Sequence, residues 1–136
     1  MLDAQVSTID INVIRVSLHV LAATIWVGGQ IVLVALMPTL HRVAPEGVAP
    51  VARAYAWVAW PALSVLVVTG FWSMTASGLM LDPTSRSTIL VKMVLVLLSG
   101  LGAALHTFAK RPMLKGVWGT AGLLTAVCAL VLGVSL

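Results

Sequence analysis

Charged residues are scarce in this chain of 136 residues: Asp, Glu, Lys and Arg make up 9% of it, whereas 60% is hydrophobic. A soluble domain carries charge on roughly a quarter of its residues, so this composition excludes a soluble globular protein. Cysteine is nearly absent too, and the only one, Cys128, lies in an apolar segment. The sequence therefore has no internal disulfide and no closely spaced cysteines that could hold a metal.

The pI of about 10.0 rests on only eight Lys and Arg against four Asp and Glu. These cations form no basic patch, and no nucleic-acid-binding motif accompanies them. A nucleic-acid partner is therefore excluded, and the lipid bilayer is the partner that the composition predicts.

Four apolar segments are each long enough to cross a hydrocarbon core, which takes about 20 helical residues. They cover approximately residues 11–40, 50–77, 87–110 and 114–135. The apolar runs are continuous, whereas strands of a membrane barrel alternate over about ten residues, so helices are predicted. No internal repeat is present. The sequence thus predicts an all-α integral membrane protein with a single domain over residues 1–136, an antiparallel four-transmembrane-helix bundle.

The charges between these segments predict an orientation. Cytoplasmic loops of membrane proteins carry an excess of Lys and Arg. The loops between helices one and two and between helices three and four are therefore predicted to be cytoplasmic, and both termini to lie outside. The basic residues that flank these two loops, opposed only by Glu46, are Arg42, Arg53, Lys110, Arg111 and Lys115.

The polar and aromatic side chains of the first segment share one face of the predicted helix. Such a stripe predicts a face that turns toward a bundle interior or a cofactor. Trp26 lies near the midplane, away from an interfacial belt, and is predicted to pack in the interior. With His19 at zero and 100° per residue, the stripe comprises Arg15 at about −40°, Trp26 at about −20°, Gln30 at about +20°, Met37 at about 0° and His41 at about +40°.

The third segment carries a similar face. With Lys92 at zero, Ser99 falls at about −20° and His106 at about −40°. Its middle is slender at Gly100 and Gly102, which allows either a close helix approach or room for a flat ligand. The second segment presents an aromatic and small-residue face, comprising Arg53, Trp57, Pro61, Ser64 and Val68.

Depth relates these faces to one another. A rise of 1.5 Å per residue places both His19 and Lys92 about 10 Å outward of the midplane. We therefore expect the two side chains to point into a shared, protein-lined space. His106 falls about 11 Å to the cytoplasmic side, Met37 about 17 Å, and His41 further still.

Each of these residues also has a purely structural interpretation. His19 and His106 could be hydrogen-bonded to a neighbouring helix, and Lys92 could extend to the outer headgroups. His41 beside Arg42 is typical of an interfacial basic pair, and Met37 of core filling. A functional His19 would be a neutral imidazole that offers a lone pair to iron or copper.

Three stretches resemble the CopD superfamily of small bacterial membrane domains, which includes the HemJ-type protoporphyrinogen oxidases. "SLHVLAATIWVGGQIVL" is similar to the first helix of that superfamily, and "LVKMVLVLLSGLGAALH" to the third. "ARAYAWVAWPALSVLVVTG" is similar to the second, with Arg53, Pro61 and Gly70 at matching places. The stretch "GGQIVLVALMPTLHR" after Trp26 departs from the HemJ-like branch and is closer to the CopD branch.

The resemblance implies a bacterial inner-membrane protein, and its HemJ-like branch implies one that binds a b-type haem in the outer leaflet. His19 would be an axial ligand, Lys92 would lie opposite it or pair with a propionate, and Trp26 would line the porphyrin. Electrons would pass between quinone or another reductant and a redox partner protein. A second haem at His106, with His41, would extend that route.

Two other functions stay open. The CopD branch implies copper transport or resistance, and His and Met suit Cu(I), with Met37, His41 and His106 as candidate ligands. The third alternative is a non-catalytic small subunit whose polar stripe docks a larger complex. The glycine- and alanine-rich faces also allow a homodimer.

Overall fold

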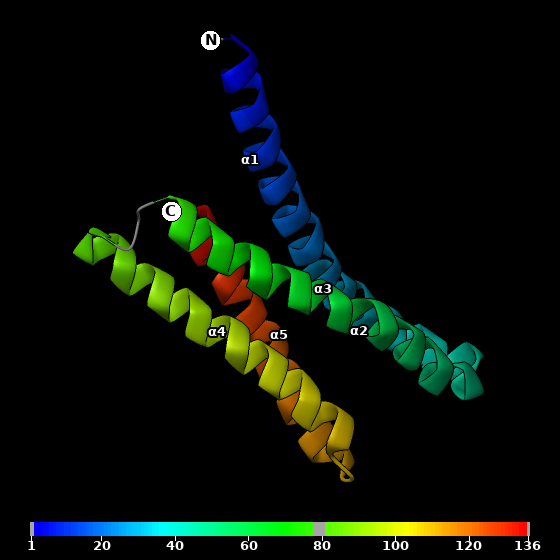
Figure 1. The fold of residues 1–136 in the computed structure, drawn as a ribbon. Coiled ribbons are helices and arrows are strands. Elements are labelled where there is room, and N and C mark those ends of the chain that lie inside the picture. Colours follow the sequence, from blue (N-terminus) through cyan, green and yellow to red (C-terminus); the bar gives the residue numbers. More distant parts are fainter. Residues whose placement is uncertain (1, 78–80, 136) are drawn as a thin grey trace. The chain divides into compact units, whose positions relative to one another are not determined.

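The computed structural model describes residues 2–77 and 81–135, with side chains from residue 11 onward. The described chain is helical and contains no strand, which confirms the predicted all-α class (Figure 1). Four stretches are long and apolar enough to cross a membrane: Ile11–Val43, Pro45–Ala76, Pro83–Phe108 and Pro112–Val134. These are the four predicted spans, and they make the chain a multi-pass membrane protein.

The chain divides into two compact units, Met1–Ala76 and Ser77–Leu136, which we call the first and second hairpins. His19 belongs to the first and Lys92 to the second. The expectation that these two side chains share one space therefore stays a prediction, and so does the single domain.

The first hairpin pairs one long interrupted helix with a second helix. The interrupted helix consists of α1 (Leu2–Ala23), a π-helical turn (Thr24–Gly28) and α2 (Gly29–Val43). A short 3₁₀ turn, Pro45–Gly47, leads into α3 (Val48–Ala76). The first helix is thus longer at both ends than the predicted 11–40. The buried side chains between the helices are mostly small, namely Ala22, Trp26, Val27, Ala59, Ala62, Leu66 and Thr69.

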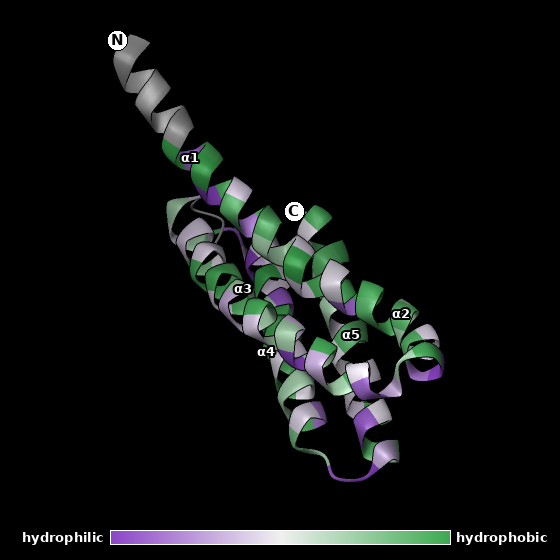
Figure 2. Ribbon diagram, turned by 90° about the vertical axis from the view of Figure 1, so that its right-hand side faces the viewer, coloured by the Kyte–Doolittle hydropathy of each residue, from purple (hydrophilic) through white to green (hydrophobic). Residues whose placement is uncertain are grey.

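The second hairpin consists of α4 (Pro83–Phe108) and α5 (Pro112–Val134), which run side by side (Figures 1 and 2). Asp82 caps α4, and its carboxylate accepts a hydrogen bond from the Ser85 backbone N–H at 2.8 Å. The hydrogen bonds from Ser85 hold the pKa of Asp82 below its ordinary value of 3.8, because they stabilise the ionised carboxylate. Pro83 then occupies the first helical turn, where its missing N–H leaves no bond unmade.

Glycine packing holds α4 against α5. A Cβ added to Gly102 would lie 2.8 Å from Gly122 Cα and 3.0 Å from the Trp118 carbonyl oxygen. Ser99, Gly100 and Gly102 are buried, as is Gly122. Of the two roles that the slender middle of α4 allowed, the structure therefore supports close helix approach.

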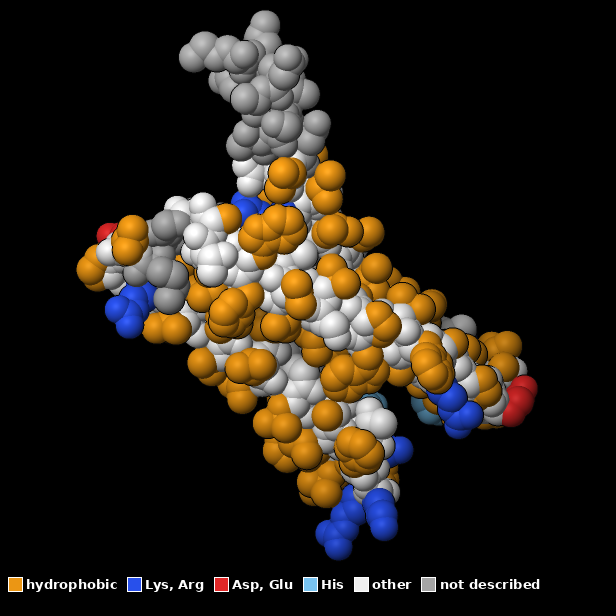
Figure 3. Space-filling view, viewed as in Figure 1, with side chains coloured by type: hydrophobic (Ala, Val, Ile, Leu, Met, Phe, Trp, Pro, Cys, Tyr) orange, Lys and Arg blue, Asp and Glu red, His pale blue; other side chains and the backbone are white. Residues whose placement is uncertain are grey.

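Large hydrophobic side chains cover the outside of both hairpins, and Lys and Arg gather near helix ends (Figure 3). Val34, Val68 and Leu97 are each about 60% exposed or more. Small residues inside and large apolar residues outside are what a membrane protein needs, because lipid rather than water surrounds it.

Candidate functional site

His19 on α1 is held by Thr69 on α3. His19 Nδ1 and Thr69 Oγ1 lie 2.8 Å apart, and the Thr69 hydroxyl lies 2.7 Å from the Val65 carbonyl oxygen. A hydroxyl has one hydrogen, and we assign it to the Val65 carbonyl, which can only accept. Thr69 Oγ1 then accepts the Nδ1–H of His19. This bond fixes the tautomer, so the lone pair of the neutral ring is on Nε2.

Gly70 follows Thr69 and lies beside the same imidazole. A Cβ at Gly70 would lie 3.5 Å from His19 Cε1, in van der Waals contact with the ring. In the sequence Gly70 stands out only by its match to the family, whereas in the structure it contacts the His19 ring. His19 itself is half-buried.

Arg15 precedes His19 by one turn on the same face of α1. Its guanidinium carbon lies 5.9 Å from the centre of the Trp72 ring, a cation–π distance. The buried Nε atom of Arg15 has no hydrogen-bond partner. The end of the first hairpin that holds His19 therefore also holds a fixed cation with an unused donor.

Trp26 is 3% exposed, as expected for an interior residue, and its ring packs on Trp60 of α3 at a centroid distance of 5.8 Å. Its backbone lies in the π-helical turn. The Trp26 carbonyl oxygen accepts hydrogen bonds from the Tyr55 hydroxyl and from Gln30 Nε2, each at 2.9 Å. Backbone groups left over by irregular helix geometry need such partners inside a membrane.

Gly29 gives Tyr55 access to this turn, because a Cβ at Gly29 would overlap the Tyr55 ring. A Cβ at Gly28 would come no closer than 3.9 Å, to Thr24 Cγ2. We expect Gly29→Ala to displace Tyr55 and destabilise the first hairpin by about 1 kcal/mol, the typical value of one hydrogen bond. Gly28→Ala is the matched control and should not destabilise.

Denaturation in mixed detergent micelles measures both variants and also Tyr55→Phe. Tyr55→Phe should cost a similar amount, and combining it with Gly29→Ala should cost less than the sum, because both act on one hydrogen bond. Equal stability of Gly28→Ala and Gly29→Ala would contradict this account of the turn.

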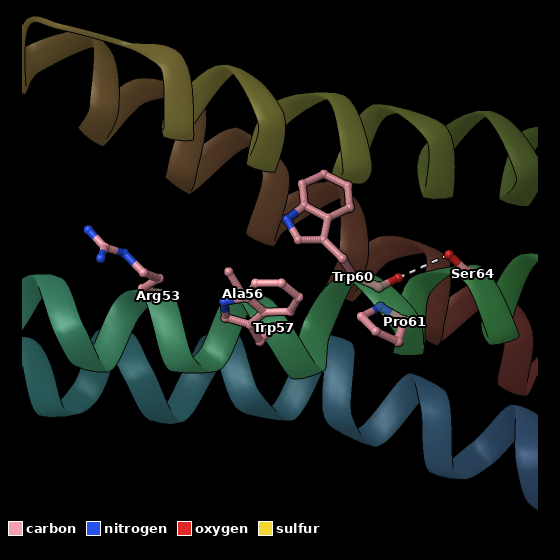
Figure 4. A pocket seen from close by; sticks show the side chains of 6 residues that line it. All are labelled: Arg53, Ala56, Trp57, Trp60, Pro61 and Ser64. Carbon is pink, nitrogen blue, oxygen red and sulfur yellow. Dashed lines mark hydrogen bonds between the residues drawn. The ribbon is translucent and has the colours of Figure 1, made fainter.

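A shallow groove runs along α3 on the face predicted to be aromatic. Its lining residues all come from α3, and they include Trp57, which is 78% exposed, and Arg53 at one end (Figure 4). Ser64 donates a hydrogen bond to the Trp60 carbonyl oxygen at 3.1 Å. The complete lining is Arg53, Ala56, Trp57, Trp60, Pro61 and Ser64.

Lys92 is half-buried in the second hairpin, and its ammonium end packs against α5. A Cβ at Gly133 would lie 2.7 Å from Lys92 Nζ, so glycine is what lets the amine lie there. A role for Lys92 opposite His19 stays a prediction.

The two other histidines are each bonded to a backbone carbonyl oxygen of their own hairpin. His106 Nδ1 donates to the Lys115 carbonyl oxygen at 2.8 Å, which ties α4 to α5. His41 Nδ1 donates to the carbonyl oxygen of Met37, one turn earlier, at 2.9 Å. His41 and His106 are exposed, and Met37 is half-buried. Among the described residues, no group of three or more His, Cys, Asp or Glu side chains could hold a metal ion.

Sequence reasoning missed Thr69, Tyr55 and Trp72 as partners of the stripe. Two sequence features could have indicated Tyr55. It is the only tyrosine of the chain, and the neighbouring helix has two adjacent glycines, Gly28 and Gly29, shortly after Trp26. No sequence pattern indicated Thr69 or Trp72, because the sequence of a single helix does not show in which register it pairs with another helix.

Comparisons with protein-family models, with curated proteins and with solved structures find no match. The fold and the residues around His19 thus define a class: a four-span helical membrane protein with an oriented histidine between two of its helices.

Proposed function

We propose that this protein binds a b-type haem in the membrane through His19 and takes part in electron transfer. The single observation that carries the proposal is the hydrogen bond between His19 Nδ1 and Thr69 Oγ1. Metal-ligating histidines usually donate their other N–H to an oxygen that fixes the ring, and Thr69 supplies such an oxygen.

The residues around His19 fit this group. Nε2 is the nitrogen that would ligate the iron, and Gly70 keeps bulk away from the ring. Arg15 adds a positive charge on the same face of α1, where the carboxylates of a haem would be favourable. When bound, the haem would supply one-electron redox chemistry, while the protein ligates it, orients it and excludes water.

A haem also needs only one or two protein ligands, whereas a Cu(I) site needs several soft ligands that converge. The described contact between Met37 and His41 joins His41 Nδ1 to a backbone carbonyl oxygen and does not involve the Met37 sulfur. The number of ligands that each group needs thus favours haem at His19 over copper at these residues.

Kinship with the CopD superfamily is part of the proposal. It is supported by the three stretches quoted above and by the place of Gly70 beside His19. The proposed location is a bacterial inner membrane with both termini outside. The support is that basic residues flank the α2–α3 and α4–α5 connections.

The test is an absorption spectrum of the full chain purified in detergent, before and after incubation with haem and with dithionite. We expect a Soret band and the sharpened α band of a reduced b-type haem, saturating at one haem per chain. Protein that stays colourless after incubation with haem, yet retains its helical circular dichroism, would contradict the proposal.

A further inference from the structure

Arg15 is a cation held in a fixed position near the end of the first hairpin. Its guanidinium lies 5.9 Å from the centre of the Trp72 ring, and Trp72 is 44% exposed. An arginine in a membrane span normally extends freely toward the headgroups. Stacking on Trp72 restricts this one to the side of α1 that faces α3.

One donor of this guanidinium is not used within the described part of the chain. Nε is buried and has no hydrogen-bond partner. A guanidinium carries five N–H donors and no acceptor, so it can be satisfied only by acceptors. A buried, charged donor without an acceptor is unfavourable, and a carboxylate that pairs with the guanidinium would lower that cost.

The surroundings indicate what kind of acceptor fits. Among the described side chains of the first hairpin, Glu46 is the only acid, and it lies at the opposite end, after α2. His19 follows Arg15 by four residues, a rise of about 6 Å along one helix face. A ligand that binds both His19 and Arg15 would therefore need a metal for the imidazole and, close to that metal, an anionic group for the guanidinium.

We propose that Arg15, stacked on Trp72, binds a carboxylate of the porphyrin whose iron His19 ligates. This inference rests on the proposed haem function. It assigns the propionate to Arg15 of the first hairpin, where sequence reasoning had considered Lys92. The planar guanidinium suits a carboxylate because it can form two parallel, charge-assisted hydrogen bonds.

The test titrates the full-length apoprotein with haem b and with its dimethyl ester, in which both carboxylates are neutral. Soret absorbance reports binding. The unchanged protein should bind the ester about tenfold more weakly, since the charge-assisted pairing with Arg15 is lost. Arg15→Gln should bind both forms equally well, and Trp72→Leu should reduce the preference.

Arg53→Gln is the matched control, because it removes the same charge at the other end of the same helix pair. It should keep the full preference for haem over the ester. Equal binding of both forms by the unchanged protein, or a preference that survives Arg15→Gln, would overturn the assignment while leaving haem binding intact. If neither haem b nor its dimethyl ester gave a Soret band, the proposed function and this inference would both be wrong.

Discussion

His19→Ala is expected to abolish the Soret band of the purified protein. The substitution removes the proposed iron ligand, and the methyl group of alanine cannot bind iron in its place. The fold should persist, because His19 is half-buried and Thr69, which bonds to it, keeps its own bond to the Val65 carbonyl oxygen. Absorption spectra and circular dichroism of the same sample measure both expectations.

His41→Ala and His106→Ala provide matched controls, since they make the same change at histidines bonded to backbone carbonyl oxygens. Both should keep the band. Thr69→Val should keep the band but lower haem affinity by about ten- to a hundredfold, because partners that orient a metal ligand typically contribute that much. A Soret band that survives His19→Ala, or that disappears in His106→Ala, would assign the ligand elsewhere.

Composition and span length were enough to predict the class of this fold. Four apolar runs without strand-like alternation leave few alternatives in lipid, and all four appear as helices. The helix ends were less accurate: the first helix begins at Leu2 rather than near residue 11 and runs to Val43 rather than residue 40. An apolar run shows which residues can lie in the hydrocarbon core, whereas the helix continues for as long as its backbone hydrogen bonds do.

The candidate site was predictable only in part. A helical period places Arg15, His19 and Trp26 on one face of one helix, and the structure finds each of them half-buried or buried. The period does not reveal which residues of α3 they meet, because that depends on the pairing register and on the π-helical turn. Thr69, which orients His19, and Trp72, which holds Arg15, could therefore be found only in the structure.

Gly102→Ala is expected to destabilise the second hairpin by roughly 1–3 kcal/mol, the usual cost of overpacking a tight contact. The added Cβ would lie 2.8 Å from Gly122 Cα, 2.9 Å from Gly122 N and 3.0 Å from the Trp118 carbonyl oxygen. All three are backbone atoms, so no side chain can rotate away and α4 must separate from α5. Denaturation in mixed micelles measures the loss.

Gly116→Ala separates this packing effect from the intrinsic effect of replacing glycine in a helix. Gly116 also lies in this hairpin, on α5, yet a Cβ there would have no neighbour within 4 Å. Alanine favours a helix over glycine by roughly 0.5–1 kcal/mol, so Gly116→Ala should be neutral or stabilising. The two substitutions should therefore act in opposite directions. If Gly102→Ala were as stable as Gly116→Ala, the close approach of α4 and α5 would not be what holds the second hairpin together.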